Sequence, residues 1–284
     1  MSSEKIVVIL IYCLSMMSSG DCKDRKHFVL VHGGCHGAWS WYKLKPLLEC
    51  AGHNVTAVDL AASGINMCKI DNVNTLEDYN QPLLLLLART PPNQKVILVG
   101  YSLGGLNQAQ ATDEYPQKVE RNVFVAAFLP DTEHRPSYVL EKYVERTPTS
   151  AWMDSRFEPS GNKTSLLFGP MFLANKLYQR SPVKGWIFQD LELAKSLVRP
   201  TSLFLEDLSR QKKFSKEGYG SVPRSYIVCT EDIAIPVDYQ QWMIQNAAVN
   251  NVLTIKGADH MVMNSKPRQL FHALQEIANP SRKL

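Results

Sequence analysis

The stretch KVILVGYSLGG, residues 95–105, decides the fold. Val96–Val99 is a short, continuous apolar run of the kind found in central strands of parallel sheets. Gly100-Tyr101-Ser102-Leu103-Gly104 follows it and leads into a helical pattern, which matches the G-x-S-x-G turn that holds a nucleophilic serine between a strand and a helix. The flanking glycines leave room for close backbone approach. The pattern predicts that Ser102 is a nucleophile and not an ordinary loop serine.

Strand-like and helix-like segments alternate on both sides of this turn. We expect strands at His27–His32, Val55–Val58, Val96–Val99, within Val119–Phe128, at Ser225–Cys229 and at Val252–Ile255, and helices at Trp41–Cys50, Leu76–Arg89, Leu103–Pro116 and from Pro267. Such alternation predicts an α/β domain, residues 27–284, with a mostly parallel sheet covered by helices on both faces. The strand signal fades from about 131 to 220, which predicts an inserted helical cap over the carboxyl ends of the strands.

Composition narrows the class of protein. Hydrophobic residues make up 45% of the 284 residues and charged residues 20%, so a sizeable core can form. The net charge of +4 comes from interspersed acids and bases without a basic stripe, which argues against nucleic acid as a partner. The six cysteines have no C-x-x-C spacing, so we expect reduced thiols, mostly in the core, and no zinc site or disulfide framework.

Residues 1–26 form an extension ahead of the domain. MSSEK, the apolar run IVVILIYCLSMM and the small residues of SSGD follow the order of a signal peptide, although Lys5 is opposed by Glu4. The apolar run is too short to cross a bilayer as a helix, so no stable membrane insertion is expected. The protein would be secretory if residues 1–20 act as a signal peptide.

A serine hydroxyl needs a neighbouring base to act as a nucleophile at neutral pH. The histidines after Ser102 are His134, His260 and His272. His134 lies at the start of the expected cap and His272 lies within a helix. His260, in KGADHM, follows a predicted strand and precedes a helix, which predicts that it is the base at the carboxyl edge of the sheet.

The acid that orients the base should lie on the loop after the preceding strand. That loop contains Thr230-Glu231-Asp232, and spacing leaves Glu231 and Asp232 as alternatives. Asp259 is adjacent to His260 in sequence and is expected to form a turn instead.

An oxyanion formed on the substrate needs preorganised N–H donors. The backbone N–H of Leu103, directly after the nucleophile, is expected to be one of them. The loop His32-Gly33-Gly34-Cys35, after the first predicted strand, is expected to supply the other.

Long stretches of the chain resemble the plant methylesterases, a family of α/β-hydrolases related to salicylic acid-binding esterase, polyneuridine aldehyde esterase and the plant hydroxynitrile lyases. The stretches that carry this resemblance are HFVLVHGGCHGAWSWYKLKPLLE, VTAVDLAASG, KVILVGYSLGG, FLPDTEHRPSYVLEKY, LVRPTSLFLEDLS, KEGYGSVPRSYIVCTED and IKGADHMVM. They run from about His27 to near the C-terminus. The resemblance implies an α/β-hydrolase fold and a carboxylesterase that works through an acyl-enzyme.

The resemblance also implies a role for particular residues. It assigns the nucleophile to Ser102, the base to His260 and the acid to Asp232. The implied oxyanion donors are Gly34 and Leu103, and the implied substrate-binding residues are Phe128, Trp152 and Met261. The implied substrates are methyl esters of small plant hormones: methyl salicylate, methyl jasmonate and methyl indole-3-acetate. No metal or organic cofactor is needed, and the family implies a cytoplasmic location and is compatible with a homodimer.

The chain departs from the family pattern in two places. Tyr101 stands where the family most often has histidine, and residues 184–189 form an apparent insertion in the cap.

Two alternatives to an esterase are a lyase and a receptor. The related hydroxynitrile lyases tend to have lysine at the position of Met261 and often threonine at that of Gly34, so this chain favours an esterase over a lyase. A non-catalytic receptor for a small acid is the other alternative, and the intact Ser102, Asp232 and His260 argue against it.

Overall fold

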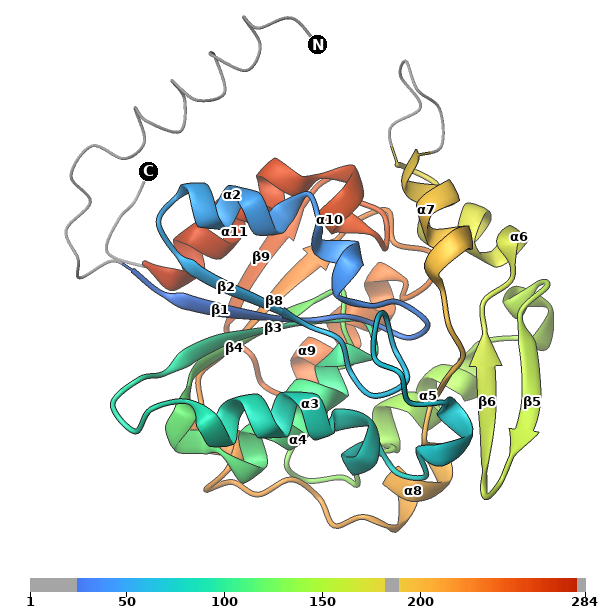
Figure 1. Ribbon diagram of the computed structural model, residues 1–284, viewed down its shortest axis with the longest axis horizontal. Coiled ribbons are helices and arrows are strands. Elements are labelled where there is room, and N and C mark those ends of the chain that lie inside the picture. The colour runs from blue at the N-terminus through green and yellow to red at the C-terminus, as the bar shows by residue number, and fades with distance from the viewer. Residues whose placement is uncertain (1–24, 182–188, 280–284) are drawn as a thin grey trace, which may run out of the picture.

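The computed structural model of the protein describes residues 25–181 and 189–279 (Figure 1). Its centre is a six-stranded sheet in the order β2-β1-β3-β4-β8-β9, and all neighbouring strands are parallel. The strands are β1 (His27–Val31), β2 (Asn54–Val58), β3 (Val96–Tyr101), β4 (Val119–Val125), β8 (Arg224–Cys229) and β9 (Asn251–Ile255). All six expected strands are present, and the α/β-hydrolase fold is confirmed.

Helices cover both faces of this sheet, with α2 and α11 above it and α3 and α4 below it in Figure 1. The helices of the α/β layers are α2 (Leu44–Cys50), α3 (Leu76–Arg89), α4 (Gly104–Glu114), α9 (Val237–Asn246), α10 (Val262–Ser265) and α11 (Pro267–Ala278). Short 3-10 turns lie at Ala38–Trp41, Ile70–Asn72, Pro116–Lys118 and Tyr219–Ser221.

Neighbouring side chains along each strand enter opposite layers of the core, as the twofold period of a strand requires. In β1, Val29 and Val31 pack with α3, α4 and α9, whereas Phe28 and Leu30 pack with α2, α10 and α11. Both layers are fully buried at these positions, which explains why the strands are continuous apolar runs. Cys35 and Cys229 are free thiols in the core, while Cys68 is half-buried and Cys50 exposed, so the expected burial of the cysteines is met only in part.

The strand order gathers the loops that hold the candidate site residues. β3 lies between β1 and β4, so the turn at Ser102 is flanked by the loops that follow Val31 and Val125. β8 and β9 pair next to each other, which brings together the loops that contain Asp232 and His260. Because the strands are parallel, all these loops leave the same edge of the sheet.

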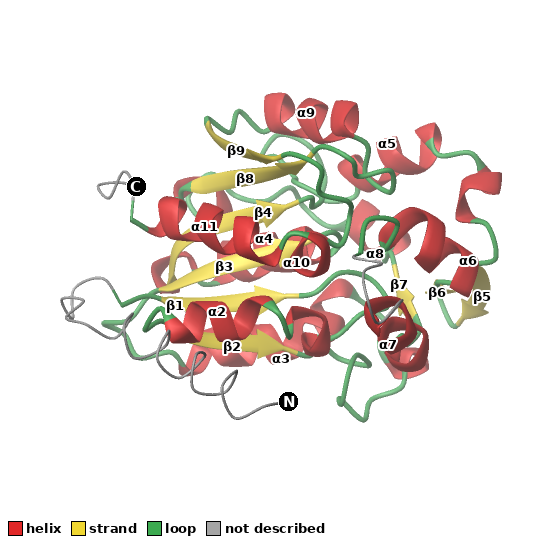
Figure 2. Cartoon of the chain, turned by 90° about the horizontal axis from the view of Figure 1, so that it is seen from above, coloured by secondary structure: helices red, strands yellow, loops and turns green. Residues whose placement is uncertain are grey.

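The chain between β4 and β8 forms a cap at this edge (Figure 2). Its elements are α5 (Tyr138–Arg146), the 3-10 turn Thr149–Trp152, β5 (Arg156–Ser160), β6 (Lys163–Leu167), α6 (Pro170–Phe172), the π-helical turn Leu173–Leu177, α7 (Gln189–Leu197), β7 (Thr201–Ser202) and α8 (Leu205–Arg210).

The expected helical cap also contains strands that the sequence analysis did not predict: β5, β6 and β7 form a three-stranded antiparallel sheet. Gly161-Asn162 is the two-residue turn between β5 and β6, and Gly161 has a φ of 63°. A Gly-Asn pair between two strands is a hairpin signal, but Pro159 and the exposed charges of β5 hide the alternation that would accompany it. The expected insertion at 184–189 and the expected signal peptide fall almost wholly outside the described residues.

Within residues 25–181 and 189–279, no helix is both long enough and apolar enough to cross a membrane.

Helix α4 can lie against the sheet only because it begins with two glycines. A Cβ on Gly105 would lie 2.1 Å from the carbonyl oxygen of Phe128, and a Cβ on Gly104 would lie 2.6 Å from that of His32. These close backbone contacts place the start of α4 between the loops that follow β1 and β4.

We predict that Gly105→Ala lowers the free energy of unfolding by about 1–3 kcal/mol, because backbone must move to admit the methyl group. Gly34→Ala is the matched control, since its Cβ would meet nothing nearer than 3.4 Å. Urea denaturation followed by circular dichroism measures both variants. Equal stability of Gly105→Ala and the wild type would contradict the close approach described for α4.

Candidate active site

Ser102 occupies a strained turn between β3 and α4. Its φ is 54°, in the left-handed region that side chains other than glycine rarely adopt, which costs about 1–2 kcal/mol. Its carbonyl oxygen accepts hydrogen bonds from the N–H of Gly105 (3.1 Å) and of Phe128 (3.0 Å). A Cβ on Gly33 would lie 2.7 Å from Cβ of Ser102, so only glycine lets the loop after β1 come this near. The surrounding backbone therefore holds the turn in its strained form.

Three candidate residues from three different loops form one hydrogen-bonded chain. His260 Nε2 lies 3.1 Å from Ser102 Oγ, and His260 Nδ1 lies 2.7 Å from Asp232 Oδ2. An imidazole nitrogen that faces a carboxylate must carry the proton, so Nε2 is left to accept the proton of the serine hydroxyl. The histidine and the aspartate are each 3% exposed. This arrangement can raise the nucleophilicity of the serine oxygen.

The carboxylate of Asp232 is held in place by backbone donors. Asp232 Oδ1 accepts hydrogen bonds from the N–H groups of Ala234 and Ile235, both at 2.8 Å, while Oδ2 faces the imidazole. Glu231 points elsewhere and forms an ion pair with Arg180 at the surface. Of the two carboxylates that spacing alone left open, Asp232 is the one that contacts His260.

A cavity of about 40 Å³ lies against Ser102 and His260. Four of the expected site residues, Gly34, Leu103, Phe128 and Trp152, are in its wall. The other lining residues are Tyr143, Leu166, Phe168, Phe172, Leu177, Leu203, Ala234 and Ile235. The wall is almost entirely apolar, which excludes water and strengthens electrostatic interactions inside the cavity.

Sequence reasoning missed most of the cap's contribution to this wall. Tyr143, Leu166, Phe172 and Leu203 come from separate cap elements with irregular connections, and no periodic pattern marks which of their faces turns inward. Met261, expected in the pocket wall, does not belong to the residues that line this cavity. Its side chain is fully buried behind His260.

Tyr101, the departure from the family pattern before the nucleophile, accounts for the position of Met261. The Tyr101 hydroxyl donates to Met261 Sδ at 3.0 Å, and its ring centroid lies 4.8 Å from that of His260. Burial raises the pKa of Tyr101 well above its ordinary value, so the phenol stays neutral. The ring therefore supports the imidazole from behind, outside the hydrogen-bonded chain.

Two buried histidines, His32 and His36, form hydrogen bonds with the backbone carbonyl groups of Gly33 and Gly34. His32 Nδ1 donates to the Gly33 carbonyl (2.8 Å), while its Nε2 accepts from the N–H of Leu60 (3.2 Å). His36 Nδ1 lies 2.9 Å from the carbonyl oxygen of Gly34, and His36 Nε2 lies 2.8 Å from the hydroxyl oxygen of Tyr178. Burial lowers the pKa of both histidines, that of His36 to about 4, so both are neutral at physiological pH.

These contacts fix the direction of the Gly34 N–H. The described chain contains no cis peptide bond, and in a trans peptide the N–H points away from the carbonyl. The Gly33 carbonyl is turned toward His32, so the N–H of the same peptide unit points the opposite way. A methyl group on Gly34 would lie 3.8 Å from a side-chain atom of Leu103, so the two residues expected to supply the oxyanion donors are neighbours.

Asp259 does more than form a turn. Its carboxylate accepts hydrogen bonds from the N–H of Arg180 (2.8 Å) and the hydroxyl of Ser265 (2.6 Å), and so ties the cap to the loop of His260. Burial raises the pKa of Asp259 to about 6.

The other two histidines considered lie away from the chain of hydrogen bonds. His134 Nδ1 pairs with Asp131 (2.7 Å) and its ring stacks on Tyr138, and His272 lies on α11.

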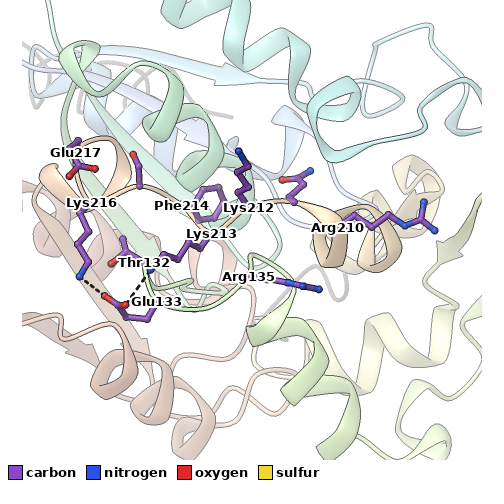
Figure 3. A pocket seen from close by; sticks show the side chains of 11 residues that line it. Thr132, Glu133, Arg135, Arg210, Lys212, Lys213, Phe214, Lys216 and Glu217 are labelled. Atoms are coloured by element: carbon purple, nitrogen blue, oxygen red, sulfur yellow. Dashed lines mark hydrogen bonds and ion pairs between the residues drawn. The ribbon is translucent and has the colours of Figure 1, made fainter.

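A larger hollow of about 720 Å³ lies elsewhere on the molecule (Figure 3). Its lining is strongly charged, and Glu133 there pairs with Lys216 (2.7 Å) and Lys213 (3.4 Å). It shares no lining residue with the cavity at Ser102 and contains no histidine. Among the residues that the structure describes, no group of three or more His, Cys, Asp or Glu side chains could hold a metal ion.

Known proteins resemble this chain over most of its length. A family model described as the alpha/beta hydrolase fold matches residues 26–267. Salicylic acid-binding protein 2 of Nicotiana tabacum is 56% identical over 262 residues, which cover 90% of this chain and 98% of the relative. Methylesterase 1 of Arabidopsis thaliana is 53% identical over 261 residues, covering 90% and 97%. The crystal structure of polyneuridine aldehyde esterase superposes with a TM-score of 0.86 at 49% identity, covering 89% of this chain and 99% of the other.

We predict that Asp259 makes the protein less stable as pH rises from about 4 to about 6. Burial raises its pKa from the ordinary value of 3.8 to about 6 in the folded chain, so the folded state binds more protons than the unfolded state in this range. Asp259→Asn removes this linkage while keeping one acceptor oxygen. The free energy of unfolding of the variant minus that of the wild type should increase by about 2–3 kcal/mol across this range.

Urea denaturation at half-unit steps from pH 4 to pH 7 measures this difference. A difference between the two proteins that does not change with pH would contradict the raised pKa.

Proposed function

The chain belongs to the α/β-hydrolase family and to its esterases of the plant methylesterase type, and from this premise we propose that it hydrolyses methyl esters of small plant-hormone acids with Ser102 as nucleophile, His260 as base and Asp232 as acid. The observation that carries the proposal is the hydrogen-bonded chain from Ser102 through His260 to Asp232 at the floor of an apolar cavity.

In the proposed acylation step, Ser102 Oγ attacks the ester carbonyl carbon and its proton passes to His260 Nε2. Asp232 stabilises the imidazolium that forms and keeps the imidazole in the required tautomer. The backbone N–H groups of Gly34 and Leu103 donate to the oxyanion. The bond from carbon to the methoxy oxygen then breaks, and His260 returns its proton to the leaving methanol.

Deacylation repeats the sequence with water. His260 takes a proton from the water as its oxygen attacks the acyl carbon, and the bond to Ser102 Oγ breaks. The serine recovers its proton from His260, and the free acid leaves.

The chemistry of the cavity wall favours largely apolar acyl groups. Phe128, Phe168 and Phe172 contribute flat aromatic surfaces, and no Asp, Glu, Lys or Arg side chain lines the cavity. Methyl salicylate, methyl jasmonate and methyl indole-3-acetate are the proposed substrates. The names of two relatives, Salicylic acid-binding protein 2 and Methylesterase 1, support salicylic acid as an acyl group and a methyl ester as the substrate, and the other two esters rest on the family resemblance alone. A homodimer remains a separate prediction, and light scattering in solution would measure the mass of the assembly.

We predict that Ser102→Ala and His260→Ala each lower kcat/KM for the preferred methyl ester by at least about 1,000-fold, because each removes a group that acts in bond formation. Asp232→Asn should cost about 100-fold or more, since the imidazole loses the partner that fixes its tautomer. Methanol release measures all three variants.

Glu231→Gln is the matched control for Asp232→Asn, because it removes the neighbouring carboxylate, which pairs with Arg180 at the surface. We expect it to retain activity within about threefold. Substantial turnover in Ser102→Ala, or equal losses in the two carboxylate variants, would refute the assigned roles.

The substrate class is tested with a panel of methyl salicylate, methyl jasmonate, methyl indole-3-acetate and mandelonitrile. We expect hydrolysis of one or more esters and no cyanide release, because the position that would need a positive charge for cyanide holds the buried thioether of Met261. Cyanide release without hydrolysis would identify a lyase, and tight binding of a free acid without turnover would identify a receptor.

A further inference from the structure

A second hollow of about 200 Å³ lies directly beside the cavity at Ser102. We call it the outer pocket; it lies between β6 and the segment 202–206 of the cap. Trp152, Leu166 and Leu203 line both hollows, so these three side chains form the wall between them. The hollow on the Ser102 side is the smaller, at about 40 Å³.

The backbone is strained directly after two of the three wall residues. Met153, directly after Trp152, has a φ of 51°, and Phe204, directly after Leu203, has a φ of 52°. Bulky residues rarely adopt a positive φ, and it persists only where the surrounding structure imposes it. Two such residues, each adjacent to a wall residue, indicate that the positions of Trp152 and Leu203 are specified at some cost in stability.

The indole of Trp152 connects the two hollows through its ring contacts. It stacks on Phe172, which lines the cavity at Ser102, with centroids 5.7 Å apart and planes at 10°. It meets Phe157, which lines the outer pocket, edge to face at 5.2 Å. A continuous aromatic surface therefore leads from the nucleophile to the outer pocket.

The outer pocket has the chemistry of a site for a neutral, apolar group. Most of its lining is aliphatic or aromatic, and its rim includes the exposed side chains of Val144 (39%) and Phe157 (44%). Its one charged lining residue is Glu206, whose carboxylate disfavours an anionic ligand.

We propose that the outer pocket is a binding subsite for the distal apolar end of the ester's acyl group, and that Trp152 and Leu203 set the length of acyl group that can reach it. This inference rests on the proposed esterase function. An ester bound with its carbonyl at Ser102 fills the small inner cavity first. An acyl group that extends beyond it passes the indole of Trp152 and places an alkyl chain or second ring in the outer pocket. The outer pocket thus extends the substrate class to methyl esters whose neutral acyl groups are longer than a single ring.

The test uses methyl esters of straight-chain acids, from acetate to octanoate, with methanol release as the readout. The quantity compared is the ratio of kcat/KM for octanoate to kcat/KM for acetate, so that a general loss of activity cancels. Thr164→Trp fills the outer pocket from β6, and Thr164 does not line the inner cavity. Leu205→Trp fills the same pocket from α8. With two independent filling variants, the test remains usable if one of them does not fold.

Glu158→Trp is the matched control. It adds the same indole to the exposed neighbouring strand β5, at a residue that lines neither hollow. We expect the octanoate-to-acetate ratio to fall at least tenfold in Thr164→Trp and in Leu205→Trp and to stay within twofold of the wild type in Glu158→Trp. Trp152→Ala should raise the ratio at least tenfold, and adding Thr164→Trp to it should cancel that gain.

Ratios within twofold of the wild type in both filling variants would overturn the subsite. A gain in Trp152→Ala that survives the addition of Thr164→Trp would overturn it as well, because the extra length would then be accommodated elsewhere. If the wild type hydrolyses no ester in the series or in the hormone panel, the proposed function itself fails. Hydrolysis of short esters with an unaltered length profile leaves the esterase standing and removes the subsite alone.

Discussion

The left-handed backbone at Ser102 is the constraint on which the rest of the structure depends. A serine can hold this conformation only where its neighbours allow no alternative, and here glycines supply the necessary space. Gly33 lets the loop after β1 approach the serine, and Gly104 and Gly105 seat helix α4 against the two flanking loops. The same close packing places the hydroxyl at the carboxyl edge of the sheet, where the loops after β8 and β9 bring Asp232 and His260.

Several hydrogen bonds join the cap to the loops around His260. The N–H of Met261 donates to the Leu177 carbonyl (3.3 Å), and the Tyr143 hydroxyl donates to the carbonyl of Ala234 (2.7 Å), two residues beyond the acid. Together with the contacts of Asp259, these bonds make the position of His260 depend on the cap as well as on β9. The cap therefore contributes to the geometry of the hydrogen-bonded chain and to the apolar wall of the cavity.

Much of the α/β layer could be predicted because local signals agree with the fold. The helix expected at Leu76–Arg89 has those bounds in the structure, since Thr75 and Asp78 form a capping box at its start. The structure of the cap was harder to predict. Polar and apolar residues do not alternate regularly in its hairpin around Gly161, and the side chains that face inward depend on tertiary packing. Spacing could not separate Glu231 from Asp232, as that choice depends on which carboxylate the turn directs inward. Met261 was expected in the wall, but the phenol of Tyr101 holds it behind the base.

In the proposed reaction, Ser102 forms a covalent bond with the substrate's acyl carbon. The most direct measurement of this reactivity is peptide mapping by mass spectrometry after reaction with a fluorophosphonate, which reacts with an activated serine. We expect one adduct, on the peptide that contains Ser102, and none in the His260→Ala variant. An adduct on another residue, or no adduct in a folded wild-type protein, would contradict it.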